Sequence, residues 1–108
     1  MAFSTDYLNS EPSPQAVSAL PGETLLEFGN AWCGHCRAAQ PGLAAAMAEH
    51  PELRHLKIAD GHGQALGRAY GVKLWPTFVL LRDGQEVARE VRPRGRDALA
   101  AMLAPVTS

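Results

Sequence analysis

The chain has 108 residues, of which 46% are hydrophobic and 19% are charged. This length suits one domain with one core, and the composition is typical of a folded globular protein rather than of a disordered one. The net charge of −1 excludes a chain-wide basic field of the kind that holds nucleic acid or an anionic membrane surface. We therefore expect neither nucleic acid nor a membrane among the partners.

The first thirty residues contain no lysine, no arginine and no long apolar run. This predicts neither a secretory signal nor a transmembrane helix, and it favours a cytoplasmic protein, or a periplasmic one if a leader has been removed. Residues 1–12 lack a clear hydrophobic period, so we expect a loose N-terminal leader.

The first elements are expected on either side of a proline turn. A short helix should begin after Ser13, which suits an N-cap, with Pro14 at its first position. Pro21-Gly22 then turns the chain into a strand at residues 24–28, whose continuous apolar run favours burial on both faces. Glu27 is an anomaly in that strand, because an acid rarely occupies a buried position.

Later elements follow from hydrophobic period and turn signals. A helix at 37–50 carries Pro41 in its interior, which should kink it, and Asp83-Gly84 is a strong hairpin signal. The other expected elements are a strand at 53–59 ended by Asp60-Gly61-His62-Gly63, a helix at 64–70 capped by Gly71, strands at 77–81 and 85–91, and a last helix with the apolar stripe Ala98, Leu99, Met102 and Leu103. This order predicts an α/β fold in which one mixed sheet has helices on both faces.

Both cysteines of the chain lie in Trp32-Cys33-Gly34-His35-Cys36, between a predicted strand and a predicted helix. Their sulfurs should meet at the first helical turn, where free N–H groups and the helix dipole stabilise a thiolate. Redox or nucleophilic thiol chemistry is therefore the first hypothesis. A zinc site would need four ligands, which no second Cys-x-x-Cys or close histidine pair supplies, and a structural disulfide closing so small a loop would stabilise little.

The chain resembles thioredoxin from about residue 13 to residue 105. The matching motifs, in order, are Glu27-Phe28, Ala31-Trp32-Cys33-Gly34-His35-Cys36-Arg37, Pro41, Tyr70-Gly71-Val72, Trp75-Pro76-Thr77 and Asp83-Gly84. The Cys-Gly-His-Cys tetrapeptide resembles that of the catalytic domains of protein disulfide isomerase. The resemblance implies a single thioredoxin-like domain over residues 1–108, with Pro76 in the cis form beside the cysteines.

The resemblance also implies a function. It is that of a monomeric protein-disulfide oxidoreductase whose only redox group is the Cys33–Cys36 disulfide, with no metal and no organic cofactor. Its substrates would be disulfide-containing proteins, and a thioredoxin-reductase-like enzyme or a small thiol would supply electrons. The alternative, from another class, is a thioredoxin-fold chaperone or assembly subunit whose cysteines only regulate docking.

Four residues carry the implied chemistry. Cys33 is expected to be the nucleophile and Cys36 the thiol that resolves the mixed disulfide. Glu27 takes the place of a buried carboxylate that accepts the proton of Cys36. His35 adds positive charge that stabilises the thiolate, so the disulfide should be more oxidising than that of ordinary thioredoxin.

Residues around the nucleophile are expected to contact substrate. They are Trp32, Gly34, Trp75, Pro76 and Arg92. Trp75 and Arg92 depart from the smaller residues of many relatives and should reshape the docking groove. Four arginines against one glutamate between residues 89 and 96 favour acidic segments near the substrate disulfide.

Three further expectations concern the surroundings of the site. Gly29 stands where many relatives carry an aromatic residue, which predicts looser packing behind the cysteines. Lys57 is the candidate partner of Glu27, but a register shifted by one residue would put Leu56 there, so this pairing stays open. His55 is expected at the surface.

Overall fold

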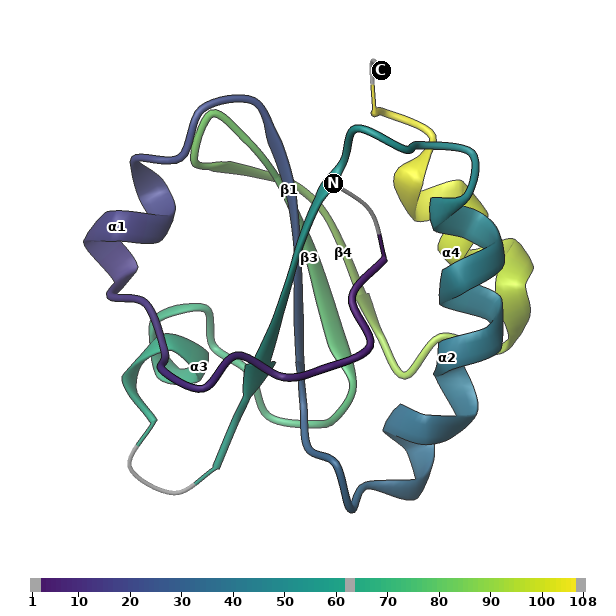
Figure 1. Ribbon diagram of the computed structural model, residues 1–108, viewed down its shortest axis with the longest axis horizontal. Helices are drawn as coiled ribbons and strands as arrows, with labels where there is room; N and C mark the ends of the chain where they lie inside the picture. The colour runs from purple at the N-terminus through teal and green to yellow at the C-terminus, as the bar shows by residue number, and fades with distance from the viewer. Residues whose placement is uncertain (1–2, 62–63, 107–108) are drawn as a thin grey trace.

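A four-stranded sheet between two pairs of helices forms the framework of the computed structural model (Figure 1), which describes residues 3–61 and 64–106. The elements are α1 (Pro14–Ser18), β1 (Glu23–Gly29), α2 (Gly34–Met47), β2 (Arg54–Ala59), α3 (Ala65–Ala69), β3 (Thr77–Arg82), β4 (Gln85–Val91) and α4 (Gly95–Leu103). The predicted order of helices and strands is confirmed. His62 and Gly63, from the expected break after β2, lie outside the described residues, as do residues 1–2 of the expected leader.

The sheet is mixed, as predicted. Its strand order is β2-β1-β3-β4; β1 runs parallel to β2 and antiparallel to β3, and β4 returns antiparallel beside β3. Every residue of β1 from Thr24 to Gly29 is buried. The continuous apolar run therefore marks a strand in the middle of the sheet, covered on both faces.

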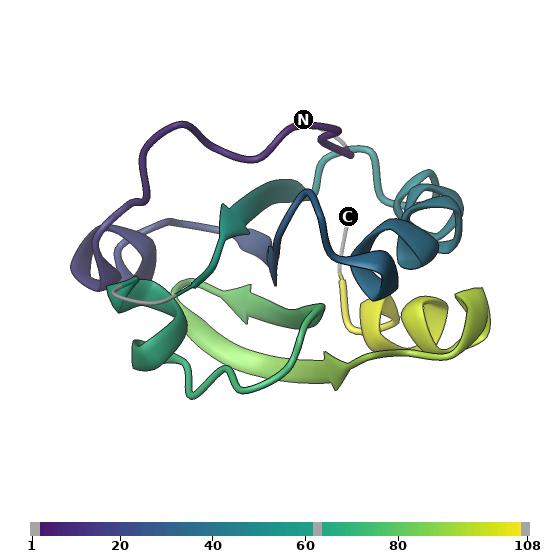
Figure 2. The same ribbon diagram turned by 90° about the horizontal axis from the view of Figure 1, so that it is seen from below.

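Helices α2 and α4 cover one face of the sheet, and α1 and α3 cover the other (Figures 1 and 2). Alternation along β1 sends Leu25 into the core under α2 and α4, and Leu26 and Phe28 into the core under α1 and α3. Since side chains two residues apart share a face, Glu27 projects with Leu25 toward α2. Among the described residues, no helix is long and apolar enough to cross a membrane.

Caps and turns explain where several elements begin. The side chain of Ser13 accepts the N–H of Ala16 at 3.0 Å, which caps α1 as predicted. Asp83 and Gly84 have positive φ of 49° and 83°, the conformation of a tight hairpin turn. Helix α2 begins at Gly34 rather than at the predicted residue 37, because Cys33 itself is its N-cap.

The N-terminal segment, residues 3–12, contains no helix or strand, but it is not the loose leader expected from its composition. Its backbone is tied to the edge strand β2: the N–H of Leu8 donates to the carbonyl of Lys57 at 2.9 Å, and the N–H of Ser4 donates to Nδ1 of His55 at 2.8 Å. In Figure 2 the segment passes over the strand layer from α1 toward the α2 side. It therefore covers an otherwise open sheet edge and adds a wall to the site described below.

Candidate functional site

The two cysteines lie at the start of α2 and differ in access. Cys33 is the N-cap residue of α2, and its Sγ accepts a hydrogen bond from the backbone N–H of Cys36 at 3.2 Å. Both residues are free thiols, and Cys33 is 8% exposed whereas Cys36 is 1% exposed. The sulfur that accepts a helix N–H is also the more accessible one, which fits the assignment of Cys33 as nucleophile.

Cys36 is held in its protonated form. Burial raises the pKa of its thiol to about 12, and a hydrogen bond with the Cys33 sulfur acts in the same direction, while a backbone hydrogen bond with Asn30 opposes both. A thiol with this pKa is almost entirely protonated at neutral pH. Any attack by Cys36 therefore needs a group that takes its proton and groups that stabilise the thiolate.

The carboxylate of Glu27 is fully buried on the α2 side of β1. Its Oε2 accepts a hydrogen bond from Nε2 of Gln40 at 2.7 Å, and its Oε1 lies 2.8 Å from Nε2 of His55. The same amide nitrogen of Gln40 donates to the carbonyl of Cys36 at 2.8 Å. Gln40 therefore links the Glu27 carboxylate to the backbone of Cys36, and each carboxylate oxygen has a partner.

His55 is buried, which corrects the expectation of a surface residue. Its side chain has no exposed area, and the ring of Phe3 stacks on it at 5.6 Å. Because the N–H of Ser4 donates to Nδ1, the ring proton belongs on Nε2, from which it is donated to Glu27. The N-terminal segment thus fixes the neutral tautomer of this histidine.

Lys57 lies opposite Glu27 in the sheet, but its ammonium bonds to other groups. Lys57 is the residue opposite Glu27 in the register of β1 and β2, so Leu56 does not take that place. Its ammonium, however, donates to Oε1 of Gln40 at 3.1 Å and to the carbonyl of Thr5 at 3.3 Å. The amide of Gln40 therefore separates the buried carboxylate from the buried ammonium and bonds to both.

The packing directly against Gly29 is close, and the expectation that this glycine loosens it is wrong. A Cβ on Gly29 would lie 2.6 Å from Sγ of Cys36 and 3.1 Å from the hydroxyl of Tyr7. The space left by the missing side chain is therefore occupied by the sulfur and by a tyrosine of the N-terminal segment.

The structure brings four of the predicted substrate-contact residues together: Trp32, Trp75, Pro76 and Arg92. The rings of Trp32 and Trp75 meet edge to face with centroids 5.4 Å apart, and Trp32 is 70% exposed. The Trp75–Pro76 peptide bond is cis, as the resemblance implies. Nε1 of Trp75 donates to Asp60 at 2.9 Å, which fixes the orientation of the indole.

Arg92 lies beside this group and contacts its backbone. Its Nε donates to the carbonyl of Trp75 at 2.8 Å, and its own N–H donates to the carbonyl of Pro76 at 2.9 Å. Arg89, counted above in the basic run, pairs with Glu86 at 2.9 Å. The local positive charge is therefore smaller than the sequence count, and the preference for acidic segments stays a prediction.

Gly34 and His35 form the first exposed turn of α2, next to Cys33. The sequence did not predict that Tyr7, Gln40 and His55 belong to the site, since polar residues in a leader, a helix and an edge strand carry no chemical signature by themselves. The alternation of β2 was an available signal, because His55 and Lys57 share the face opposite to Leu56 and Ile58.

Within residues 3–61 and 64–106, no group of three or more histidine, cysteine, aspartate or glutamate side chains is arranged to hold a metal ion.

Comparison with known proteins places these features in a family. Residues 5–105 match the family model described as Thioredoxin. The chain is 34% identical to a thioredoxin of Chlamydia trachomatis over 88 residues, which are 82% of this chain and 86% of that protein. Protein disulfide-isomerase of Gallus gallus is 36% identical over 78 residues, which are 68% of this chain and 15% of that protein. Among solved structures, thioredoxin 2 from Pseudomonas aeruginosa in its reduced form is 52% identical, with a TM-score of 0.82 and 92% of each chain covered.

Proposed function

The chain belongs to the thioredoxin family of thiol–disulfide oxidoreductases, and from this premise we propose that it reduces or exchanges disulfides of protein substrates through Cys33 and Cys36. The observation that carries the proposal is the arrangement of the two thiols. Cys33 caps α2 and keeps 8% of its surface exposed, and Cys36 lies one turn inward with 1% exposed.

The reaction takes two steps. The Cys33 thiolate attacks one sulfur of the substrate disulfide, so that a mixed disulfide forms and the first substrate thiolate leaves. Cys36 then loses its proton and attacks the Cys33 sulfur, which breaks the mixed disulfide and releases the second substrate thiolate. The substrate gains two electrons, and the protein's dithiol becomes the Cys33–Cys36 disulfide.

Glu27 is the proposed proton acceptor in the second step. Its buried carboxylate acts electrostatically on the Cys36 thiol, Gln40 bonds both to it and to the backbone carbonyl of Cys36, and the hydrogen bonds from Gln40 and His55 hold its oxygens in place. His35, exposed beside Cys33, is proposed to make the disulfide more oxidising than that of ordinary thioredoxin. Electrons would return from a reductase or from a small-thiol pool.

Replacement of the nucleophile tests the proposal. Cys33→Ser should abolish reduction of a disulfide-linked model protein, because the serine hydroxyl is not ionised at neutral pH. Cys36→Ser, the matched control, should still form the mixed disulfide and then stop, which mass spectrometry detects as a stable adduct. Biological activity that survives Cys33→Ser intact would instead support the alternative of a docking subunit.

A further inference from the structure

The N-terminal segment places a hydroxyl group at the buried cysteine. The Tyr7 hydroxyl and Sγ of Cys36 approach the same point beside Gly29, at 3.1 Å and 2.6 Å from the position of a Cβ there. A side-chain hydrogen bond with Cys36 is among the contacts that raise the pKa of Tyr7. Tyr7 and Cys36 also line one hollow of about 720 Å³ between the N-terminal segment and the start of α2.

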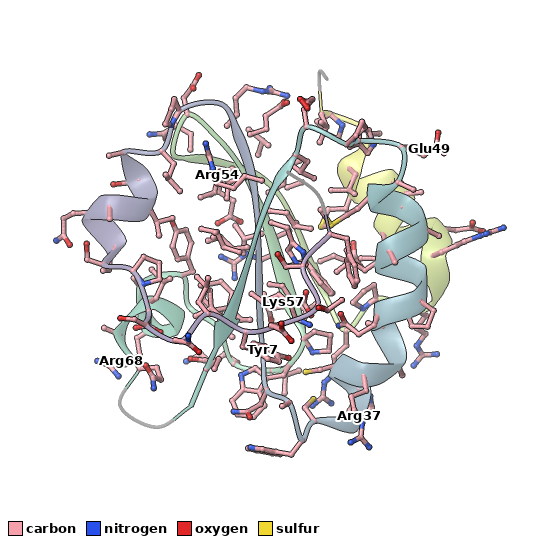
Figure 3. All side chains as sticks on the ribbon, viewed as in Figure 1. Tyr7, Arg37, Glu49, Arg54, Lys57 and Arg68 are labelled. Carbon is pink, nitrogen blue, oxygen red and sulfur yellow. The ribbon has the colours of Figure 1, made fainter. Side chains whose placement is uncertain are left out.

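Tyr7 is held in this position from both sides. The ammonium of Lys57 lies 4.6 Å from the centre of its ring, a distance at which a cation and an aromatic face attract. The same ammonium donates to the carbonyl of Thr5, and the N–H of Leu8 donates to the carbonyl of Lys57. Figure 3 shows Tyr7 and Lys57 close together where the N-terminal segment crosses β2. The hydroxyl is thus positioned by a segment fixed on either side of it.

We propose that Tyr7 donates a hydrogen bond to the Cys36 sulfur and stabilises the thiolate that forms in the second, resolving step. The inference rests on the proposed function and adds a catalytic residue to it. A hydrogen bond to a charged acceptor is about twice as strong as one between neutral groups. The contact therefore strengthens as Cys36 loses its proton and favours the step more than the resting thiol.

The charges around Cys36 explain why a neutral donor is useful there. Glu27 and an ionised Cys33 both oppose a negative charge on Cys36, and the ammonium of Lys57 is already bonded to Gln40 and Thr5. Burial, Glu27 and the two cysteines raise the pKa of Tyr7, so its hydroxyl keeps its proton at neutral pH. In the balanced step the proton of Cys36 passes to Glu27, the Cys36–Cys33 bond forms, and the substrate thiolate leaves.

Tyr7→Phe tests the proposal, because it keeps the ring over Lys57 and removes only the hydroxyl. The probe is the aromatic disulfide dithiobis(nitrobenzoate), which releases one coloured thiolate on attack by Cys33 and a second on attack by Cys36. Loss of the hydrogen bond should lower the Cys36 thiolate fraction by about tenfold, and the more basic thiolate should regain about threefold in nucleophilicity. The second release should therefore slow by about threefold at pH 7, with the first release unchanged.

The chain offers a matched control, since Tyr70 is its only other tyrosine. Tyr70→Phe should leave both releases at wild-type rates. In the Tyr70→Phe variant, Tyr7 is the one remaining tyrosine, so 3-fluorotyrosine is incorporated at position 7 alone. The fluorinated hydroxyl is more acidic and therefore a stronger hydrogen-bond donor, and it should accelerate the second release. A second release in Tyr7→Phe that equals wild type from pH 6 to 9, or an equal slowing of both releases, overturns the inference. Failure of the first release in the wild-type protein would instead refute the proposed function.

Discussion

At the scale of single residues, the two thiols have opposite surroundings. Cys33 is bonded to a helix N–H and is the more exposed of the two, whereas Cys36 is almost fully buried near a carboxylate and its thiol has a pKa raised to about 12. The Cys33 sulfur is therefore the better placed of the two to contact a substrate, and Cys36 stays protonated until the second step. The proposed order of attack rests on this asymmetry.

Replacement of the buried acid should separate the two steps. Glu27→Gln keeps the shape of the side chain but removes the base, so we expect release of the second substrate thiolate to slow by about tenfold or more, while the first is unaffected. Single-turnover kinetics with dithiobis(nitrobenzoate) measure both. Glu23→Gln, at the other end of β1 and paired with Arg82, is the control. Equal kinetics for Glu27→Gln and wild type would remove Glu27 from the mechanism.

His35, the second of the two residues between the cysteines, should set the direction of electron flow. Reference potentials are about −270 mV for thioredoxin and about −180 mV for protein disulfide isomerase, and we expect this protein to lie between them. His35→Pro should shift its midpoint toward thioredoxin by roughly 30 mV or more, which the oxidised fraction in glutathione buffers measures. His50→Gln, three residues beyond the far end of α2, should shift nothing. A wild-type midpoint at thioredoxin's own value would refute the role of His35.

How far the sequence predicts the site depends on whether a residue has a motif. Cys33, Cys36 and Pro76 belong to recognisable spacings, and Glu27 stands out as an acid in an apolar strand. Gln40, His55 and Tyr7 reach the same site from a helix, an edge strand and a coil, and only tertiary packing brings them together.

At the scale of elements, the β3–β4 hairpin is fastened to the loop before β1. The N–H of Gly22 donates to the Asp83 carboxylate at 2.7 Å, and the N–H of Asp83 donates back to the carbonyl of Gly22 at 2.8 Å. Gly84 packs so closely on Ser18 that a Cβ there would clash with the carbonyl oxygen of Ser18. The Asp-Gly signal predicted the turn correctly, but not its docking, because the partners lie more than sixty residues away.

This docking predicts unequal effects of two glycine substitutions. Gly84→Ala meets both a positive φ of 83° and the Ser18 backbone, so the free energy of unfolding should fall by more than about 2 kcal/mol. Gly22→Ala has a similar φ of 73° but nothing within 4 Å of its Cβ, and should cost only about 1 kcal/mol. Urea denaturation measures both. Equal losses would mean that the contact with Ser18 contributes nothing.

At the scale of the whole molecule, the site is assembled from separate parts of the chain. The N-terminal segment, β1, the start of α2 and β2 each supply one or two side chains to the cluster around Cys36. The fold class and element order could be predicted from hydrophobic period and turns, since these are local. The role of the N-terminal segment could not, because its contacts join residues about fifty positions apart and its composition is that of a coil.

The buried thiol should make the reduced protein less stable in alkali. Above about pH 8.5 an unfolded cysteine loses its proton, whereas Cys36 in the folded protein keeps it up to about pH 12. The unfolded state then binds fewer protons, so the free energy of unfolding falls as pH rises, by at most about 1.4 kcal/mol per pH unit. Urea denaturation of the reduced protein at about pH 7.5, 8.5 and 9.5 measures the slope. Cys36→Ser should show a shallower slope, and parallel slopes would contradict the expectation.

The Trp32–Trp75 contact has an optical consequence. These are the two tryptophans of the chain, one directly before the nucleophile and the other before the cis proline. Intrinsic tryptophan fluorescence of the native protein is therefore emitted entirely beside the reacting sulfur, with no background from the helices or from the far end of the sheet. We therefore expect oxidation of the thiols and binding of a protein substrate to change this emission, which would report both in real time without an attached dye.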